Sequence, residues 1–417
     1  MSSKTKNTAA AVMVPKLRFP EFRGVALRSV QLGDVTEEGR RRNGKKHSVA
    51  SVMGVAKADG IVPMKARLIA ADIERYKLVE HDWFAYNPMR LNIGSIARWK
   101  GESEILVSPD YVVFKCITDD ESGIVPDYLD HFRQAKAWED FVTEGGDGGV
   151  RVRIYYKDIA RLQLALPSLP EQQKIAECLS SVDELMAAQA RKVDALKTHK
   201  KGLMQQLFPR EGETQPRLRF PEFQNAGEWE RTTIGELNPF LTSGSLGWAA
   251  FYADKGELFV RITNLWRGSI YLDLTDSKFV QLPPGANEGV RTQLKEYDVL
   301  ISITADIGIV GYVDKSVPSP AYINQHIALV RFVEGQLCGK FVAYFLASEE
   351  SQRLFRASTD NGAKAGMNLI GIQKIGLMLP SVPEQHRIAN CLSSLDDLIA
   401  AQTQKLEALK TYKKGLM

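Results

Sequence analysis

Two stretches of the chain repeat apolar residues every seven positions. Each run is apolar except for a central glutamine, and the ten positions are Ile175, Val182, Gln189, Leu196, Leu203, Ile388, Leu395, Gln402, Leu409 and Leu416. A second apolar stripe adjoins each run and is predicted to consist of Leu179, Leu185, Met186, Val193, Leu392, Leu398, Ile399 and Leu406. A heptad pattern kept over about four repeats is typical of a coiled-coil seam. It predicts two helices, each roughly 50 Å long at 1.5 Å per residue.

Each predicted helix has a start signal. The spacing Ser-x-x-Glu occurs at 168–171 and again at 381–384, and Pro170 and Pro383 would lie in the first turn. This spacing predicts a capping box, and proline is tolerated in a first turn because its missing N–H has no partner there. The polar seam position in each helix can fix register and partner choice.

The two helical stretches are copies of one another. Residues 166–204 and 379–417 align without a gap and match at 27 of 39 positions. The duplication reaches the start of each half, because KLRFPEF at 16–22 corresponds to RLRFPEF at 217–223. The first copy continues beyond its last shared residue, whereas the second stops at Met417. We therefore expect the last turn of the second helix to fray.

The sequence preceding each helix predicts a globular domain, at 16–165 and 217–378. Runs rich in β-branched and aromatic residues predict strands, and Tyr, Leu, Phe and Trp at helical spacing predict one short helix in each domain. The predicted strands cover 105–116, 162–166, 322–332 and 375–379, and the predicted short helices cover 126–142 and 339–357. We expect 1–15 to be a disordered tail, 166–207 and 379–417 to be the long helices, and 208–216 to be a linker.

Two arrangements of the helices are compatible with these patterns. Each helix could cover its own domain, or the two seams could pack on each other. Duplication favours the second, and antiparallel packing would hold the domains apart and give the molecule a pseudo-two-fold axis with two equivalent partner surfaces. The predicted fold is a mixed α/β (α+β) protein in which two globular domains are separated by a pair of long antiparallel coiled-coil helices.

Composition narrows the class of protein. Apolar and charged contents of 44% and 25% are ordinary for a soluble globular chain, and the net charge of +4 does not by itself indicate nucleic acid. The four cysteines are widely spaced and lack metal-site spacing, so we expect reduced thiols in the cytoplasm. No apolar run approaches the roughly 18 residues of a membrane span.

Two unlike domains on a symmetric scaffold suit a split, asymmetric target such as duplex DNA, whose grooves repeat about every 34 to 36 Å. Arg, Asn and Gln can pair with base edges and Lys with phosphate. The candidate DNA-binding residues are polar or basic and lie in predicted loops: Arg40, Arg41, Arg42, Lys45, Lys46, Arg90, Asn92, Arg151, Arg153, Arg261, Asn264, Arg267, Asn324, Gln325, His326, Lys364 and Asn368. The basic turn RRRNGKK at 40–46 is the most suggestive patch.

No catalytic site is predicted. Tyr86-Asn87-Pro88-Met89 is similar to the loop with which amino-methyltransferases hold a flipped adenine, but the second proline and the following aromatic residue are absent. The six histidines form no HExxH pairing, so neither a zinc site nor a catalytic triad is predicted.

The layout resembles the specificity subunit of type I restriction-modification systems. The blocks that carry the resemblance are KLRFPEF and RLRFPEF, YNPMRLNIGSIA, DVLISITADIGIVGYV, INQHIALVRF, and the two LPSxPEQ-led helices that end in KKGLM. The resemblance covers residues 16–417 and is most specific in the helical repeats.

The resemblance implies two target recognition domains, each reading one half of a bipartite DNA site, and two helices that act as a spacer and dock two methyltransferase subunits. It places S-adenosylmethionine, ATP and Mg, with methylation and cleavage, in partner modification and restriction subunits, and predicts no cofactor in this chain. Two alternatives remain open from the sequence: a self-contained DNA adenine methyltransferase or nuclease, and a coiled-coil DNA-binding scaffold without enzymatic partners.

Overall fold

The computed structural model describes residues 17–57, 59–118, 122–144, 153–283, 285, 289–357 and 366–417. The chain forms two compact units, and each contains a part of both long helices. Unit 1 comprises the described residues up to Gln189 together with Lys405–Met417, and unit 2 comprises Ala190–Gln404. The predicted tail at 1–15 lies outside the described residues.

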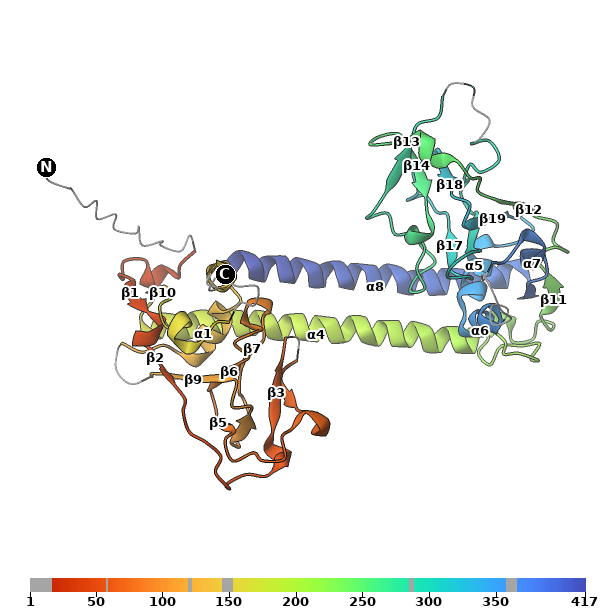
Figure 1. The fold of residues 1–417 in the computed structure, drawn as a ribbon. Coiled ribbons are helices and arrows are strands. Elements are labelled where there is room, and N and C mark those ends of the chain that lie inside the picture. The colour runs from red at the N-terminus through yellow and green to blue at the C-terminus, as the bar shows by residue number, and fades with distance from the viewer. Residues whose placement is uncertain are drawn as a thin grey trace, which may run out of the picture. The chain divides into compact units, whose positions relative to one another are not determined.

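The two long helices form where the heptads predict them. Helix α4 spans Leu169–Leu207 and helix α8 spans Val382–Leu416, each as one continuous helix (Figure 1). Helix α8 stays helical to Leu416, so the expected fraying of its last turn is not seen. None of the described helices has the length and apolar content that a membrane crossing needs.

Within unit 1, the end of α8 runs antiparallel to the beginning of α4. The Lys413 ammonium lies 2.7 Å from the Asp183 carboxylate, while Leu416, further along α8, lines the same cavity as Ile175, which is earlier in α4. Contacts that move forward on one helix and backward on the other define an antiparallel pair.

Unit 2 repeats this arrangement with the roles of the helices exchanged. The Lys200 ammonium lies 2.6 Å from the Asp396 carboxylate, and Leu207, later in α4, shares a hydrophobic core with Ile388, earlier in α8. The predicted antiparallel pairing is therefore confirmed in each unit.

The predicted seam positions face the interior. Val182, Gln189 and Ile388 are buried, and the other seven are half-buried. The second stripe differs from the prediction, because Leu185 and Leu398 are 58% and 40% exposed. In α4 the buried or half-buried residues of this stripe are instead spaced seven apart, and they are Leu179, Met186, Val193 and Lys200. The sequence pattern missed Lys200 because only apolar residues were counted in it, although the aliphatic part of a lysine side chain can be buried.

The helix starts also differ from the prediction. Glu171 and Glu384 do not complete capping boxes, because each carboxylate receives two hydrogen bonds from an arginine of the RFPEF motif. Arg18 donates to Glu171 over 2.6 Å at both oxygens, and Arg219 donates to Glu384 over 2.7 Å at both oxygens. These pairs fasten the opening segment of each half to its long helix.

A buried glutamine at each helix start makes a second repeated set of contacts. The Gln172 side chain accepts from the Val125 amide over 2.8 Å and donates to the Pro167 carbonyl over 2.9 Å. Its repeat equivalent, Gln385, accepts from the Cys338 amide over 3.0 Å. The same backbone geometry is therefore fixed twice at the junction between domain and helix.

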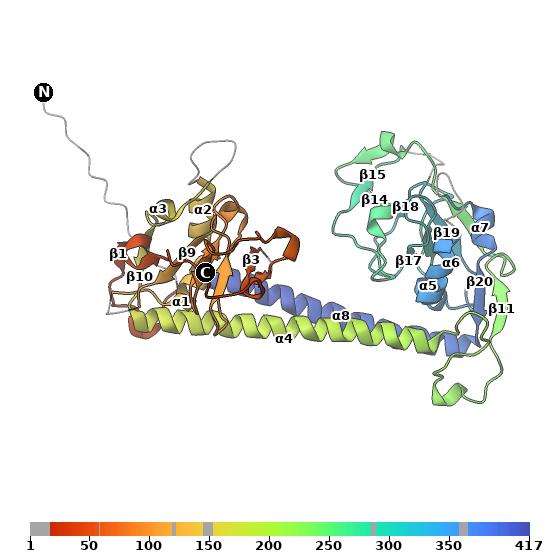
Figure 2. The same ribbon diagram turned by 60° about the horizontal axis from the view of Figure 1, so that its bottom comes forward.

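Unit 1 is built from small antiparallel sheets beside the first half of α4. Its largest sheet has four strands in the order β2-β9-β6-β7. The other sheets of unit 1 are two-stranded and consist of the pairs β1-β10, β3-β4 and β5-β8. The strands are β1 (Arg28–Gln31), β2 (Thr36–Glu38), β3 (Met53–Ala56), β4 (Gly60–Pro63), β5 (Lys77–Val79), β6 (Phe84–Tyr86), β7 (Ile96–Arg98), β8 (Ile105–Val107), β9 (Val112–Cys116) and β10 (Gln163–Leu166). The helices are α1 (Pro126–Phe132), α2 (Lys136–Glu144) and α3 (Tyr156–Ile159), and α1 lies along α4 (Figure 2).

Unit 2 contains the counterpart of that sheet, in the order β12-β19-β16-β17. It adds the pair β11-β20 and a second four-stranded sheet, β13-β15-β14-β18, in which β14 and β18 are parallel. The strands are β11 (Glu230–Thr233), β12 (Phe240–Ser243), β13 (Tyr252–Ala253), β14 (Glu257–Val260), β15 (Lys278–Val280), β16 (Val299–Ser302), β17 (Val310–Tyr312), β18 (Ala321–Ile323), β19 (Ile327–Arg331) and β20 (Gly376–Leu379). The helices are α5 (Gly339–Ala347), α6 (Glu349–Ala357) and α7 (Leu369–Gln373).

Three local predictions are corrected. Each predicted short helix is two helices; Ser348, for example, adopts an extended conformation between α5 and α6. The predicted strands at 105–116 and 322–332 are each split by a turn. The predicted linker begins with Phe208, but this ring is 4% exposed and packs into the core of unit 2.

His131 on α1 should make unit 1 sensitive to acid. Burial and the nearby Lys413 lower its pKa, against the opposing effect of Asp183 and Asp130. The folded state then binds this proton less readily than the unfolded state, so stability falls as the pH drops below the unfolded value of about 6.5. We expect the free energy of unfolding to fall between pH 7.5 and 5.5, and this loss to be absent in His131→Asn, as measured by urea denaturation. The exposed His199 supplies the control, since His199→Asn should keep the loss.

Candidate nucleic-acid interface

The basic turn of unit 1 is partly neutralised by acidic neighbours. The Lys46 ammonium lies 2.5 Å from Glu104, whose other oxygen lies 3.6 Å from Arg41, and Arg41 also pairs with Glu80. Lys46 and the adjacent His47 lower the pKa of Glu104. The sequence could not indicate this, because the carboxylates come from segments about 40 to 60 residues away.

Three other basic side chains of this turn remain open to a partner. Arg40 and Lys45 have side chains that are 84% and 87% exposed, and they pair with Glu38 and Glu74 respectively. Arg42 is exposed and donates to the Arg75 carbonyl over 2.8 Å. A surface ion pair is weak and exchangeable, so these groups can turn to a phosphate.

A second basic surface of unit 1 forms at the turn before β7. Arg90 and Asn92 are exposed there, and Gly94 closes the turn with a φ of +89°. A Cβ at Gly94 would lie 3.5 Å from the Lys57 side chain, so the β3–β4 hairpin brings Lys57 beside this turn. Lys57 was missed because the sequence does not show which hairpin meets which turn.

Arg153 joins the same surface. The amide of the next residue, Ile154, donates to the Pro88 carbonyl over 3.0 Å, which places Arg153 next to the turn that carries Arg90. Arg153 itself is exposed. Arg151 lies outside the described residues.

Two asparagines predicted to contact DNA in unit 2 have structural roles instead. Asn264 is 1% exposed, and its amide donates to the Asp273 carbonyl over 2.7 Å while its oxygen accepts from the Arg261 amide. Asn324 is 8% exposed, and its oxygen accepts from the His326 amide over 3.2 Å. Both amides are used in holding loops, which corrects their assignment.

The arginines of unit 2 are held in place by acidic or polar neighbours. Arg261 donates to Asp276 at both the carbonyl and the carboxylate, over 2.8 and 2.9 Å. Arg267 pairs with Asp306 and donates to the Ile307 carbonyl over 3.0 Å. Arg267 still has an exposed side chain, so it can meet a partner in a fixed orientation.

Gln325 and His326 lie at a junction of loops in unit 2. Their side chains are 3.0 Å apart, and the other ring nitrogen of His326 lies 2.5 Å from the Thr304 hydroxyl. Arg291, which the sequence reasoning missed, reaches the neighbouring loop and donates to Ser245 over 2.9 Å. The structure therefore brings together polar groups from segments far apart in the chain.

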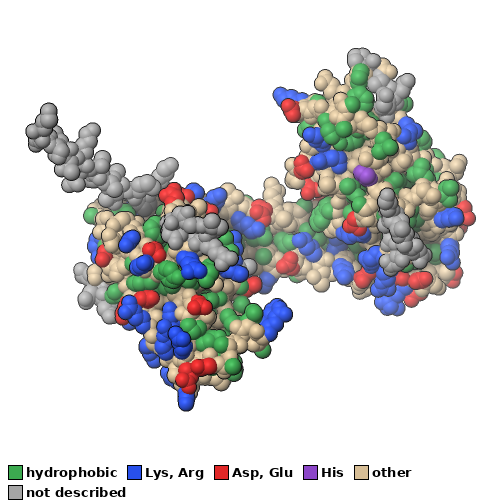
Figure 3. Space-filling view, in the orientation of Figure 1, with side chains coloured by type: hydrophobic (Ala, Val, Ile, Leu, Met, Phe, Trp, Pro, Cys, Tyr) green, Lys and Arg blue, Asp and Glu red, His purple; other side chains and the backbone are tan. Residues whose placement is uncertain are grey.

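Two further predicted residues do not join this junction. Asn368 caps α7 by accepting from the Gly371 amide over 2.8 Å, and Lys364 lies outside the described residues. Figure 3 shows Lys and Arg interleaved with Asp and Glu on both units. The candidate surfaces are thus local clusters within a mixed charge distribution.

The segment that is similar to a methyltransferase loop is a structural turn. Tyr86 is fully buried, burial raises its pKa, and the Asn87 side chain accepts from the Met89 amide over 2.9 Å. Within the described ranges, no three His, Cys, Asp or Glu side chains converge as a metal site requires.

Known proteins share both the sequence pattern and the fold. The family model described as "Type I restriction modification DNA specificity domain" matches residues 284–411. The putative type I restriction enzyme MjaX specificity subunit of Methanocaldococcus jannaschii is 24% identical over 83% of this chain and 79% of its own length. The MjaVIII specificity subunit of the same organism is 24% identical over 72% of this chain and 70% of its own length. These matches bear out the resemblance to type I specificity subunits that the sequence shows.

Solved structures agree with the fold of a specificity subunit. A solved structure described as "Crystal structure of Type-I restriction-modification system S subunit from M. genitalium" aligns with a TM-score of 0.59 at 12% identity over 97% of this chain and 99% of that one. A second structure, described in terms of complex assembly and conformational transition of the type I R-M system, aligns with a TM-score of 0.57 at 18% identity over 96% of this chain and 98% of that one. The predicted fold class is confirmed.

Proposed function

We propose that this chain is the DNA sequence-specificity subunit of a type I restriction-modification complex and works in the cytoplasm. The observation that carries the proposal is that two unlike loop surfaces stand on one duplicated framework, in which Arg18–Glu171 and Arg219–Glu384 are equivalent pairs. Duplicated contacts keep each domain in the same relation to its helix, while the loops are free to differ. Each unit would then read its own half of a bipartite, asymmetric site.

The chemistry of modification and cleavage is assigned to partner subunits. Methyltransferase subunits would supply S-adenosylmethionine chemistry, and restriction subunits would use ATP and Mg. The contribution of this chain is positioning and sequence choice, which depend on side chains aimed at base edges and phosphates.

The exposed leucines of the two helices suit the docking of two identical methyltransferase subunits. Leu185 and Leu398 are 58% and 40% exposed, and each has an exposed alanine three residues later on the same helix. The two positions are separated by 213 residues and are therefore equivalent in the repeat. Two identical subunits bind through equivalent surfaces, so a pair of equivalent exposed apolar residues suits the docking of two copies of one partner.

Leu185→Arg is expected to weaken one of two methyltransferase sites about ten- to hundredfold, the loss expected from no longer burying one leucine. Native mass spectrometry should then show one bound subunit in place of two, and the double variant with Leu398→Arg should bind none. Leu354→Arg changes an equally exposed leucine outside the repeat and should retain both. Two bound subunits on the double variant would exclude this surface.

Base-resolution mapping of methylated adenines in cells carrying this chain and its methyltransferase tests the function itself. We expect a split, asymmetric motif. Exchanging residues 16–165 for those of another family member should change one half of that motif and leave the other unchanged. Methylation by the purified chain alone, or a change in both halves, would contradict the proposal.

Arg90→Ala should weaken binding of the cognate DNA by about 1 to 3 kcal/mol and relax the choice of base at one position, since its exposed turn is suited to a base edge. Arg40→Ala should weaken binding to all sequences alike and reduce the salt dependence, as expected for a phosphate contact. Titrations at two salt concentrations, with cognate and scrambled duplexes, separate these outcomes. Equal losses on both duplexes for Arg90→Ala would remove it from base recognition.

A further inference from the structure

A loop of unit 2 carries a leucine that the rest of the unit leaves uncovered. The loop 244–247 leaves β12 and leads to Trp248, and Leu246 within it is 82% exposed. Gly247 follows with a φ of +91°, a left-handed conformation that turns the chain back toward Trp248. Burial of a leucine side chain is favourable, so a partner that covers Leu246 would gain binding free energy.

The backbone on both sides of Leu246 is anchored to unit 2. On one side Ser245 forms a parallel bridge with Asn324, and a Cβ at Gly244 would lie 2.1 Å from the Asn324 carbonyl carbon. The loop therefore rests directly on the Asn324 backbone. On the other side Trp248 is 3% exposed, and its ring centroid lies 5.0 Å from that of Phe259. Leu246 is thus exposed on a loop whose two ends are fixed.

Arg291 provides a third anchor and a positive charge. Its guanidinium donates to the Ser243 carbonyl over 2.8 Å and to the Ser245 hydroxyl over 2.9 Å. It also donates to the Thr242 hydroxyl. The acceptors that it meets in the described part of the chain are neutral, and Arg291 is exposed. Its charge can therefore attract an anionic partner to the loop that carries Leu246.

The segment beneath this loop continues from Asn324 into Gln325 and His326, whose half-buried side chains lie 3.0 Å apart. Two adjoining loops thus present an apolar side chain, a guanidinium and an amide. In the major groove of DNA, apolar side chains contact the thymine methyl group, amides pair with base edges and basic groups bind phosphate. This combination of groups favours duplex DNA over an apolar protein surface.

We propose that Leu246 contacts the 5-methyl group of a thymine in the half-site that unit 2 reads. The inference rests on the proposed DNA function and adds a base type to it, because thymine is the one standard base that carries a methyl group in the major groove. Arg291 is a positioning residue in this arrangement, since it holds the loop that carries Leu246.

Deoxyuridine, which lacks the 5-methyl group, provides the test. Methylation mapping gives the motif, and the exchange of residues 16–165 identifies the half that unit 1 reads, so the other half is assigned to unit 2. Each thymine of that half is replaced in turn by deoxyuridine, and the affinity of the full chain with its methyltransferase subunits is measured for each duplex. We expect about fourfold weaker binding at one position, the effect of one buried methyl group.

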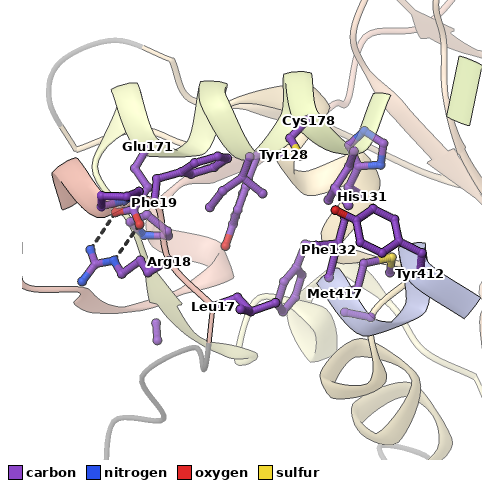
Figure 4. A pocket seen from close by; sticks show the side chains of 17 residues that line it. Leu17, Arg18, Phe19, Tyr128, His131, Phe132, Glu171, Cys178, Tyr412 and Met417 are labelled. Carbon is purple, nitrogen blue, oxygen red and sulfur yellow. Dashed lines mark hydrogen bonds and ion pairs between the residues drawn. The ribbon is translucent and has the colours of Figure 1, made fainter. Parts of the chain in front are cut away.

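Leu246→Ala should bind the thymine and deoxyuridine duplexes equally, because the methyl group has lost its contact. Arg291→Lys retains the charge but not the forked donor, and it should reduce the difference between the two duplexes. Leu17→Ala is the matched control and should keep the fourfold effect. Leu17 is 64% exposed and belongs to unit 1, where it lines the same cavity as Phe132 (Figure 4). A folding defect would weaken both duplexes alike, so the ratio of affinities reports the methyl contact.

A fourfold effect that persists in Leu246→Ala, or its absence at every thymine of the half-site, would overturn the inference and leave the DNA function intact. Loss of bound methyltransferase subunits from Leu246→Ala, with the thymine effect unchanged, would also overturn it and assign this leucine to a protein contact. Equal binding of the motif and a scrambled duplex by the unaltered chain would overturn the DNA function itself.

Discussion

Replacing Arg219 by alanine is expected to lower the free energy of unfolding of unit 2 by about 3 kcal/mol or more. The Glu384 side chain is fully buried, and both of its oxygens accept from Arg219, whose own side chain is 8% exposed. Removing the arginine would leave a buried carboxylate without its charge partner, and that desolvation cost is large. The Ala226 and Gly227 carbonyls, which accept from the same guanidinium, would lose a donor as well.

Hydrogen exchange of the full chain, followed by mass spectrometry, assigns this loss to a unit. Peptides around the start of α8 should exchange faster in Arg219→Ala, while those of β6 and β9 in unit 1 keep their rates. Arg353→Ala is the control, because Arg353 is 62% exposed and its pairs with Glu349 and Glu350 lie at the surface. Such pairs contribute about 0 to 1 kcal/mol. Equal effects for the two variants would show that Glu384 is not effectively buried.

Asp396→Ala and Asp183→Ala, the same change at equivalent positions of the repeat, are expected to have very different effects. Asp396 is 11% exposed, and it accepts from Lys200, which is equally buried, and from the Tyr344 hydroxyl, each over 2.6 Å. Its loss would leave a buried ammonium and a buried hydroxyl without this acceptor. We expect unit 2 to lose about 3 to 5 kcal/mol.

Asp183 lies in a wetter environment. Its side chain is 40% exposed, and its partner Lys413 retains Gln134 as a second acceptor over 2.9 Å. We expect Asp183→Ala to cost unit 1 about 1 kcal/mol or less. Denaturation with exchange readouts on 169–189 and on 190–207 compares the two variants directly. Similar losses in both units would mean that sequence equivalence, and not burial, sets the strength of these pairs.

The long helices were predictable from the sequence because their pattern is local and repeated. Val182 and Ile388 are buried where a seven-residue spacing places them. Lys200 was not predictable as a seam residue, since its burial depends on Asp396, which is 196 residues away. The expected capping boxes were not predictable for the same reason. Their glutamates bind arginines that are distant in the sequence.

The candidate DNA-binding residues were harder to predict, because residue type alone does not reveal exposure. Asn264 and Arg90 are both polar loop residues, yet Asn264 is buried by hydrogen bonds to Asp273 and Asp276, whereas Arg90 is exposed. Lys57 and Arg291 could be recognised as candidate DNA-binding residues only from the structure, because their loops lie beside other candidate residues in the folded chain. Sequence patterns identified the family and the framework, while the surfaces required tertiary structure.

The Lys–Asp pairs of the two long helices have a genetic consequence. Each copy of the repeat carries both members of the pair, since Asp183 and Lys200 belong to the first copy and Asp396 and Lys413 to the second. A single ancestral copy, made as a separate polypeptide, would therefore already contain the groups needed to pair with its own duplicate. Fusion of two such genes would require no compensating change at this contact, and each domain could afterwards diverge alone.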